Sequence, residues 1–174
     1  MKMKEETKQR LTDCAREFRM PRYQEIPNVG LYLEQTSQYI SDCLSPLLEE
    51  ALTGSMISNY VKKGLIPSPV KKRYDRDQIA YLLFIALTKS VVSLDDLFLF
   101  IELQKRTYPT QRAYEYICAE FENLLQYVFG LKDELATIGV DSSDEKIMLR
   151  STIITVAHKI YLDKCFRALA QELE

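Results

Sequence analysis

Short polar and basic side chains recur along one stretch of the chain with the spacing of a helix face. Between residues 53 and 64 they lie opposite the apolar side chains, and they are Ser55, Ser58, Asn59 and Lys62. Hydroxyl, amide and ammonium groups bind base edges and phosphate oxygens. A carboxamide can also bind adenine N6 and N7 together. The pattern predicts a hydrogen-bonding, basic outer face, and on a DNA-binding surface Ser55, Ser58 and Asn59 are the candidate base contacts.

Three consecutive cations follow a few residues later, after a segment stiffened by proline. Pro67 and Pro69 keep the backbone extended, so the cations lie on the return limb of a tight hairpin or loop. The predicted phosphate contacts are Lys62, Lys63, Lys71, Lys72 and Arg73. With about five such contacts, the affinity for DNA is expected to fall roughly as the 4.5th power of the salt concentration per protomer.

Positive charge is concentrated in this block. Residues 55–76 hold six cations and one anion, a net charge of +5, while the whole chain carries −2, which leaves −7 for the remainder. A compact positive surface on an acidic body favours a polyanionic partner. The alternative is an ordinary solvated surface rich in lysine.

Residues that support catalysis or metal binding are scarce. The chain has one histidine, His158, and four scattered cysteines without a C-x-x-C pair. It has no G-x-S-x-G, glycine-rich phosphate loop or H-E-x-x-H pattern. We expect no enzyme, no metal and no cofactor. His158 lies on a helical stripe and is expected in the core or at an interface.

The elements that position these residues are predicted to be helical. The 174 residues are 47% apolar and 28% charged, with only 5 Gly and 6 Pro, which favours a mainly α globular chain. Thr53 and the pair Asp75 and Gln78 are predicted helix caps. Apolar periodicity predicts helices at about 5–19, 31–44, 55–63, 76–89, from 93, at 109–129 and from 143 to the end, with a further turn or two at 47–52.

The sequence offers no segment for membrane insertion. Its first residues lack an apolar signal core, and its longest near-continuous apolar run, residues 79–87, is far shorter than the ~20 residues that cross a bilayer. We expect a cytoplasmic protein, with its cysteines as small buried thiols.

Several motifs resemble the winged helix-turn-helix of mercury-resistance-type (MerR-type) regulators. They are Ile57-Ser-Asn-Tyr60-Val-Lys-Lys-Gly64-Leu-Ile66-Pro, Tyr74-Asp75, the apolar residues 79–85 and Ser93-Leu94-Asp95-Asp96-Leu97. The resemblance covers about residues 53–100. It implies a DNA-binding transcriptional regulator that places helix 55–63 in the major groove and the basic wing 67–74 on phosphates.

A second resemblance covers more of the chain. Pro21-Arg-Tyr, Ile26-Pro27, Leu31-Tyr32-Leu33-Glu34-Gln35, Leu52-Thr53, residues 56–62 and Lys72-Arg73-Tyr74 are similar to the bacterial domain-of-unknown-function family number eighteen-thirty-six. That resemblance also implies a MerR-like fold. The sequence departs from typical MerR-type regulators, with Ser58-Asn59-Tyr60 in place of Arg-Tyr-Tyr, so it implies no particular target sequence.

We divide the chain into an N-terminal helix and connector (1–30), a winged helix-turn-helix-like domain (31–106) and a C-terminal helical region (107–174). Residues 142–145 are predicted to cap the last helix. Apolar residues on two sides of that helix favour a homodimer through the C-terminal helices, and burial within a monomer is the alternative. Aromatic residues in this region are expected in the core, with a small-molecule effector pocket as the lesser possibility.

A different class of function stays open. A winged-helix scaffold can serve as a protein–protein interaction module with no DNA binding. The net negative charge and the absence of arginine from helix 55–63 favour that interpretation, whereas the paired cations on helix and wing favour DNA.

Overall fold

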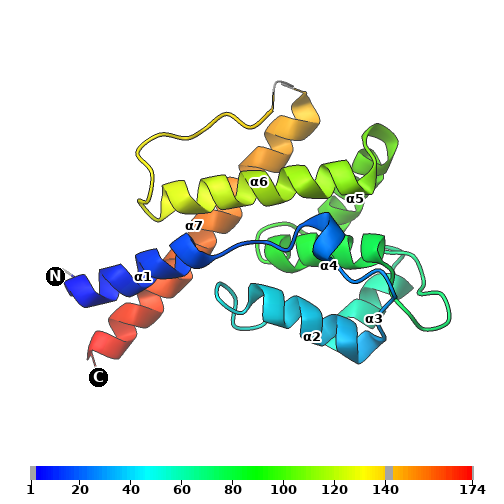
Figure 1. Ribbon diagram of the computed structural model, residues 1–174, viewed down its shortest axis with the longest axis horizontal. Coiled ribbons are helices and arrows are strands. Elements are labelled where there is room, and N and C mark those ends of the chain that lie inside the picture. Colours follow the sequence, from blue (N-terminus) through cyan, green and yellow to red (C-terminus); the bar gives the residue numbers. More distant parts are fainter. Residues whose placement is uncertain (1–2, 140–142, 174) are drawn as a thin grey trace. The chain divides into compact units, whose positions relative to one another are not determined.

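A computed structural model describes residues 3–139 and 143–173 of the chain (Figure 1). This described part is mainly α-helical and holds only two isolated β-bridges and no strand. Its helices are α1 (Glu5–Glu17), the short 3-10 helix η1 (Tyr23–Glu25), α2 (Leu33–Leu44), α3 (Gly54–Lys62), α4 (Arg76–Thr88), α5 (Leu94–Thr107), α6 (Thr110–Val128) and α7 (Asp144–Leu173).

The predicted helices are confirmed except for one. Residues 47–52 form no further helix, because Pro46 has no N–H to donate and only the Leu47 and Leu48 N–H groups still donate to the Leu44 carbonyl, after which the helical pattern ends. Burial of Leu47 and Leu52 holds this segment in place instead, and the Ser37 hydroxyl donates to the Leu52 carbonyl at 2.6 Å. Of the predicted cap at residues 142–145, Ser142 lies outside the described residues. The Ser143 carbonyl accepts the first hydrogen bonds of α7.

The chain divides into two compact units. Residues 20–118 form one unit, and residues 1–19 together with 119–174 form the other. We call them the central unit and the terminal unit. This division differs from the predicted segments 1–30, 31–106 and 107–174, because α1 packs with the C-terminal helices rather than with the connector.

The central unit is built around α4. This helix is apolar on nearly every side, with Ile79, Leu82, Leu83 and Ile85 fully buried. Helix α2 contacts both α3 and α4, and Figure 1 shows α2 and α4 side by side. The Tyr81 hydroxyl donates to Gln104 on α5 at 2.7 Å. Helix α4 is therefore the core element against which the neighbouring helices are arranged.

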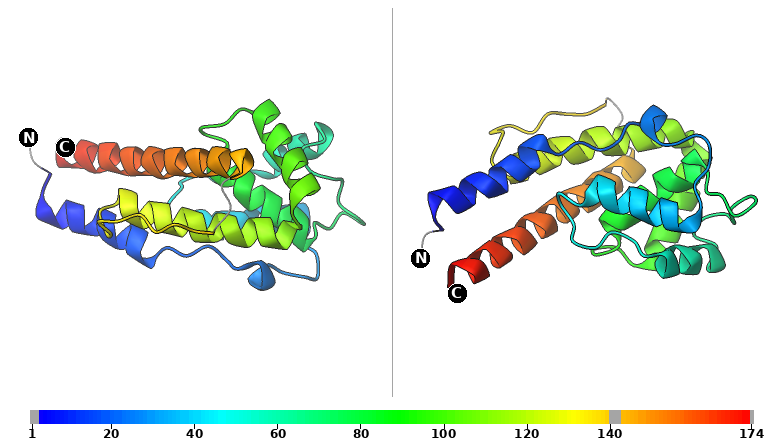
Figure 2. Two further views of the ribbon diagram at one scale, coloured as in Figure 1. Left: turned by 90° about the horizontal axis from the view of Figure 1, so that it is seen from above. Right: turned by 60° about the horizontal axis from the view of Figure 1, so that its bottom comes forward.

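The terminal unit joins the two ends of the chain. Helix α1 runs beside α7, and the start of α1 lies near the end of α7 (Figure 2). The Thr7 hydroxyl donates to Glu172 at 2.5 Å, and the rings of Phe18 and Phe121 pack edge to face with centroids 5.8 Å apart. Contacts between residues far apart in sequence therefore hold this unit together.

Two features of the described residues bear on the sequence predictions. His158 is exposed, so of its two predicted places the core is wrong and an interface stays a prediction. The helical stripe that it shares with half-buried Tyr161 turns toward solvent at that point, since the buried side of α7 carries Ile153, Val156 and Ile160.

No described helix combines the length and the apolar character required to span a bilayer.

Candidate nucleic-acid interface

Helix α3 is short and anchored on one side. The Thr53 hydroxyl accepts from the Met56 N–H at 3.2 Å and caps the helix as predicted. Ile57 and Tyr60 are buried, and burial raises the pKa of the Tyr60 phenol. These two side chains fix α3 to the central unit.

The opposite side of α3 faces solvent with polar groups. Ser55, Ser58, Asn59 and Lys62 are all exposed. They lie at intervals of three and four residues and so share one face. Among the described residues, the side chains of Ser55, Ser58 and Asn59 find no hydrogen-bond partner. Their donors and acceptors are thus available to an external ligand.

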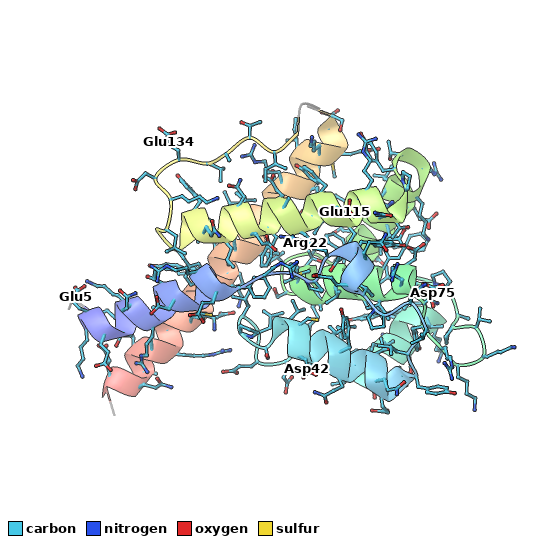
Figure 3. All side chains as sticks on the ribbon, viewed as in Figure 1. Glu5, Arg22, Asp42, Asp75, Glu115 and Glu134 are labelled. Atoms are coloured by element: carbon cyan, nitrogen blue, oxygen red, sulfur yellow. The ribbon has the colours of Figure 1, made fainter. Side chains whose placement is uncertain are left out.

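The loop after α3 is fastened at both ends. Gly64 ends the helix with φ +76°, a conformation that favours glycine. Gln78 then holds the loop from α4, because its buried side chain donates to the Pro67 carbonyl at 2.9 Å. Gln78 also forms the predicted capping box with Asp75. Figure 3 labels Asp75 where the loop enters α4.

The tip of this loop is a tight turn that presents two lysines. The Arg73 N–H donates to the Val70 carbonyl at 2.9 Å, and Lys71 and Lys72 between them have φ values of 50° and 62°. Two positive φ angles are typical of a type I′ turn, which favours Asn-Gly. Both lysines are exposed and, within the described part of the chain, form no ion pair. In Figure 1 the loop extends away from the helices of its unit.

A second contact ties the loop to the start of α2. Leu31 and Tyr74 exchange two backbone hydrogen bonds, at 3.0 and 2.8 Å. Next to this bridge the Arg73 guanidinium lies 4.8 Å from the centre of the Tyr32 ring and donates to the Tyr32 hydroxyl and the Val29 carbonyl. Arg73 is exposed but held in place, whereas the two tip lysines are not.

One cation of the basic block has a structural role. Arg76 donates to the Ile26 carbonyl and to Gln24, each at 2.9 Å, and lies over the Tyr23 ring. The Tyr23 hydroxyl donates to Asp77 at 2.5 Å. Burial and this hydrogen bond raise the pKa of Tyr23 to about 12. Arg76 therefore fastens the connector to α4, and the cations presented outward are those of α3 and the loop.

All eight predicted contact residues are exposed in the central unit, four on α3, one at its C-terminal end and three on the loop. Their roles as base or phosphate contacts stay predictions. Sequence reasoning missed Tyr32 and Gln78 as parts that hold the loop. Leu31 and Tyr32 belong to the residues that carry the second resemblance, but nothing local to them indicates that Arg73, 41 residues after Tyr32, is the partner of Tyr32. The described residues contain no group of three or more potential metal ligands.

Comparison with known proteins places the sequence in a family. The family model described as Domain of unknown function (DUF1836) matches residues 21–117, more than half of the chain. The chain belongs to this family. The match takes in the connector, α3, the loop and the helices on which they pack. No curated protein and no solved structure matches the sequence.

Proposed function

We propose that this member of the DUF1836 family is a DNA-binding transcriptional regulator with a MerR-like winged helix-turn-helix. In this proposal α2 and α3 form the helix pair, α3 is the recognition helix, and the loop at residues 63–75 is the wing. The backbone bridge between Leu31 and Tyr74 supports it, because it fixes the wing next to the first helix of the pair.

One observation carries the proposal. An anchored helix offers hydrogen-bonding groups without partners on its outer face, and the adjoining turn holds two unpaired lysines in backbone conformations that lysine rarely adopts. Left-handed conformations at residues other than glycine cost about 1 kcal/mol or more each. Two lysines at positions with this backbone cost indicate that their positive charges have a function at the turn. Contact with DNA phosphates is such a function.

In the proposed complex the two elements have different tasks. The major groove is wide enough for one helix, so α3 enters it with Asn59 toward adenine and with Ser55 and Ser58 toward bases or phosphates. Lys62 and Lys63 neutralise phosphates beside the groove, and the wing cations do the same further along the backbone. Phosphate contacts fix the position of the protein, while α3 reads the sequence.

Fluorescence anisotropy with the DNA upstream of the gene, at two salt concentrations, tests this function. We expect binding that weakens steeply with salt and that is abolished in Lys72→Glu/Arg73→Glu, with helicity unchanged. A matched control reverses two cations elsewhere in the central unit, Lys89→Glu/Arg112→Glu, and is expected to bind normally. Equal binding by wild type and the wing variant contradicts the proposal.

A second function has specific support. Arg73 and Arg76 are engaged within the chain, and α3 carries no arginine, although arginine makes the commonest base contact. A protein–protein interaction module that uses the basic surface on an acidic partner fits these facts. That function predicts no preference for the upstream DNA over unrelated duplex in the same titration, with weak binding that disappears at the higher salt concentration.

A further inference from the structure

We propose that a second copy of this chain docks on the outer face of α5 and forms a two-fold symmetric dimer. The proposal concerns an apolar surface in the central unit that is separate from α3 and the loop. It does not depend on DNA binding, and its test contains no DNA.

The outer face of α5 exposes two large apolar side chains next to each other. Phe98 is 45% exposed and Leu99 is 53% exposed, whereas Leu97 and Ile101 on the inner side are buried. Exposed phenylalanine and leucine at neighbouring positions make a small apolar patch, which is typical of a contact surface.

Charged residues extend this patch into a stripe along the helix. Asp95, Leu99, Glu102 and Arg106 follow one another at intervals of three or four residues and so share one face, and Phe98 lies beside Leu99 at its edge. Asp95 and Arg106 are exposed at its two ends. The stripe therefore begins with acidic Asp95, continues with apolar Phe98 and Leu99 and with Glu102, which pairs with Lys105 of the same helix at 2.9 Å, and ends at basic Arg106.

That order of charges, together with the apolar pair, suits a second copy of the same helix as the occupant. The first turn of α5 carries Asp95 and Asp96 and the last turn carries Lys105 and Arg106. When two copies of such a helix pack antiparallel about a two-fold axis, Asp95 of each lies opposite Arg106 of the other, and Leu99 lies opposite Glu102. Both ends of the contact are then neutralised, as an isologous interface requires.

Helix α7 offers a contrasting apolar surface. It exposes Ile147, Met148, Leu162 and Phe166, and a dimer through the C-terminal helices was the expectation from sequence. Its first turn is acidic, but its last turn holds no basic residue among those described. The nearest cations, Lys164 and Arg167, lie about two turns before the end of α7, whereas those of α5 lie in its last turn, so the charge pattern favours α5.

A reciprocal charge exchange tests the proposal by sedimentation velocity over a concentration series. We expect the wild type to dimerise with rising concentration, and Asp95→Arg and Arg106→Asp each to weaken dimerisation at least tenfold. The double variant Asp95→Arg/Arg106→Asp is expected to restore it. Residues 95 and 106 lie about 16 Å apart along one helix, so restoration requires contact between two copies.

Two further variants separate the surfaces. Leu99→Asp is expected to abolish dimerisation, whereas Phe166→Asp, on the equally open surface of α7, is expected to leave it unchanged. Thermal melting checks that each variant stays folded. Three outcomes would overturn the proposal. They are a wild type that stays monomeric at every concentration, a double variant that does not regain dimerisation, and a dimer that is lost in Phe166→Asp but kept in Leu99→Asp.

Discussion

Lys71 and Lys72 occupy backbone conformations that suit asparagine and glycine better than lysine. Replacing them by Lys71→Asn/Lys72→Gly relieves this strain, so we expect the free energy of unfolding to rise by about 1 kcal/mol. The same change removes two proposed phosphate contacts. The affinity for DNA should fall, and the slope of log affinity against log salt should shrink by about 1.8. Urea denaturation and anisotropy titrations measure the two effects.

The matched control removes two cations without changing a strained backbone. Lys62→Gln/Lys63→Gln lies at the end of α3, where both residues have ordinary right-handed or helical backbone angles. We expect a similar loss of DNA affinity and no gain in stability. If the hairpin variant gains stability but binds DNA as tightly as wild type, the wing lysines make no phosphate contact.

Tyr23 gives the central unit a dependence on high pH. Its pKa is raised to about 12 by burial and by the hydrogen bond to Asp77, against about 10 in an unfolded chain. The stabilisation from the protonated phenol is therefore complete below about pH 10 and is lost as the pH rises toward 12. Urea denaturation from about pH 9 to pH 12 should show a steeper loss of stability in wild type than in Tyr23→Phe. Parallel curves for the two proteins would contradict this role.

At the scale of the element, Gln78 connects the start of α4 to the loop. Its side chain completes the cap with Asp75 and donates to the Pro67 carbonyl. In Gln78→Met the cap weakens and this carbonyl loses its partner, so we expect the free energy of unfolding to fall by about 2 kcal/mol. DNA affinity should fall as well, because the loop loses its attachment to α4. Urea denaturation and anisotropy measure both.

Gln35 provides the control for this prediction. Its side chain accepts from the Tyr32 N–H at 3.0 Å and so caps α2, but it is exposed. Gln35→Met is expected to cost about 0.5 to 1 kcal/mol, the value of a cap alone. Equal losses in the two variants would show that the contact of Gln78 with Pro67 contributes nothing.

The helices could be predicted from sequence because their signals are local. Thr53, and Asp75 with Gln78, cap helices whose apolar residues repeat every three or four positions. Residues 47–52 misled the same reasoning, since a short run of leucine and glutamate favours a helix, whereas Pro46 and burial of Leu52 decide otherwise. The exposure of the polar face of α3 followed from periodicity. The contact between the Arg73 guanidinium and the Tyr32 ring could not be predicted in this way, because it joins segments that are distant in the sequence.

For the whole molecule, the distribution of charge matters more than its sum. The block at residues 55–76 carries +5 and the remaining chain −7. Within the block, Arg76 is used to hold the connector, so the outward positive charge comes from α3 and the loop. An acidic remainder opposes binding of DNA anywhere else on the surface. This distribution suits the proposed contact of a polyanion with α3 and the loop.

The terminal unit depends on contacts between the N-terminal segment, which includes α1 and Phe18, and the C-terminal helices. Phe18 is buried and packs on Phe121, while Phe166 on α7 is 66% exposed. Phe18→Ala should lower the free energy of unfolding by about 3 to 4 kcal/mol, and Phe166→Ala should change it by less than about 0.5 kcal/mol. Urea denaturation measures the losses, and hydrogen exchange should show faster opening of α1 and α7 in the first variant alone. If both variants lose the same stability, the packing of α1 against the C-terminal helices does not hold this unit together.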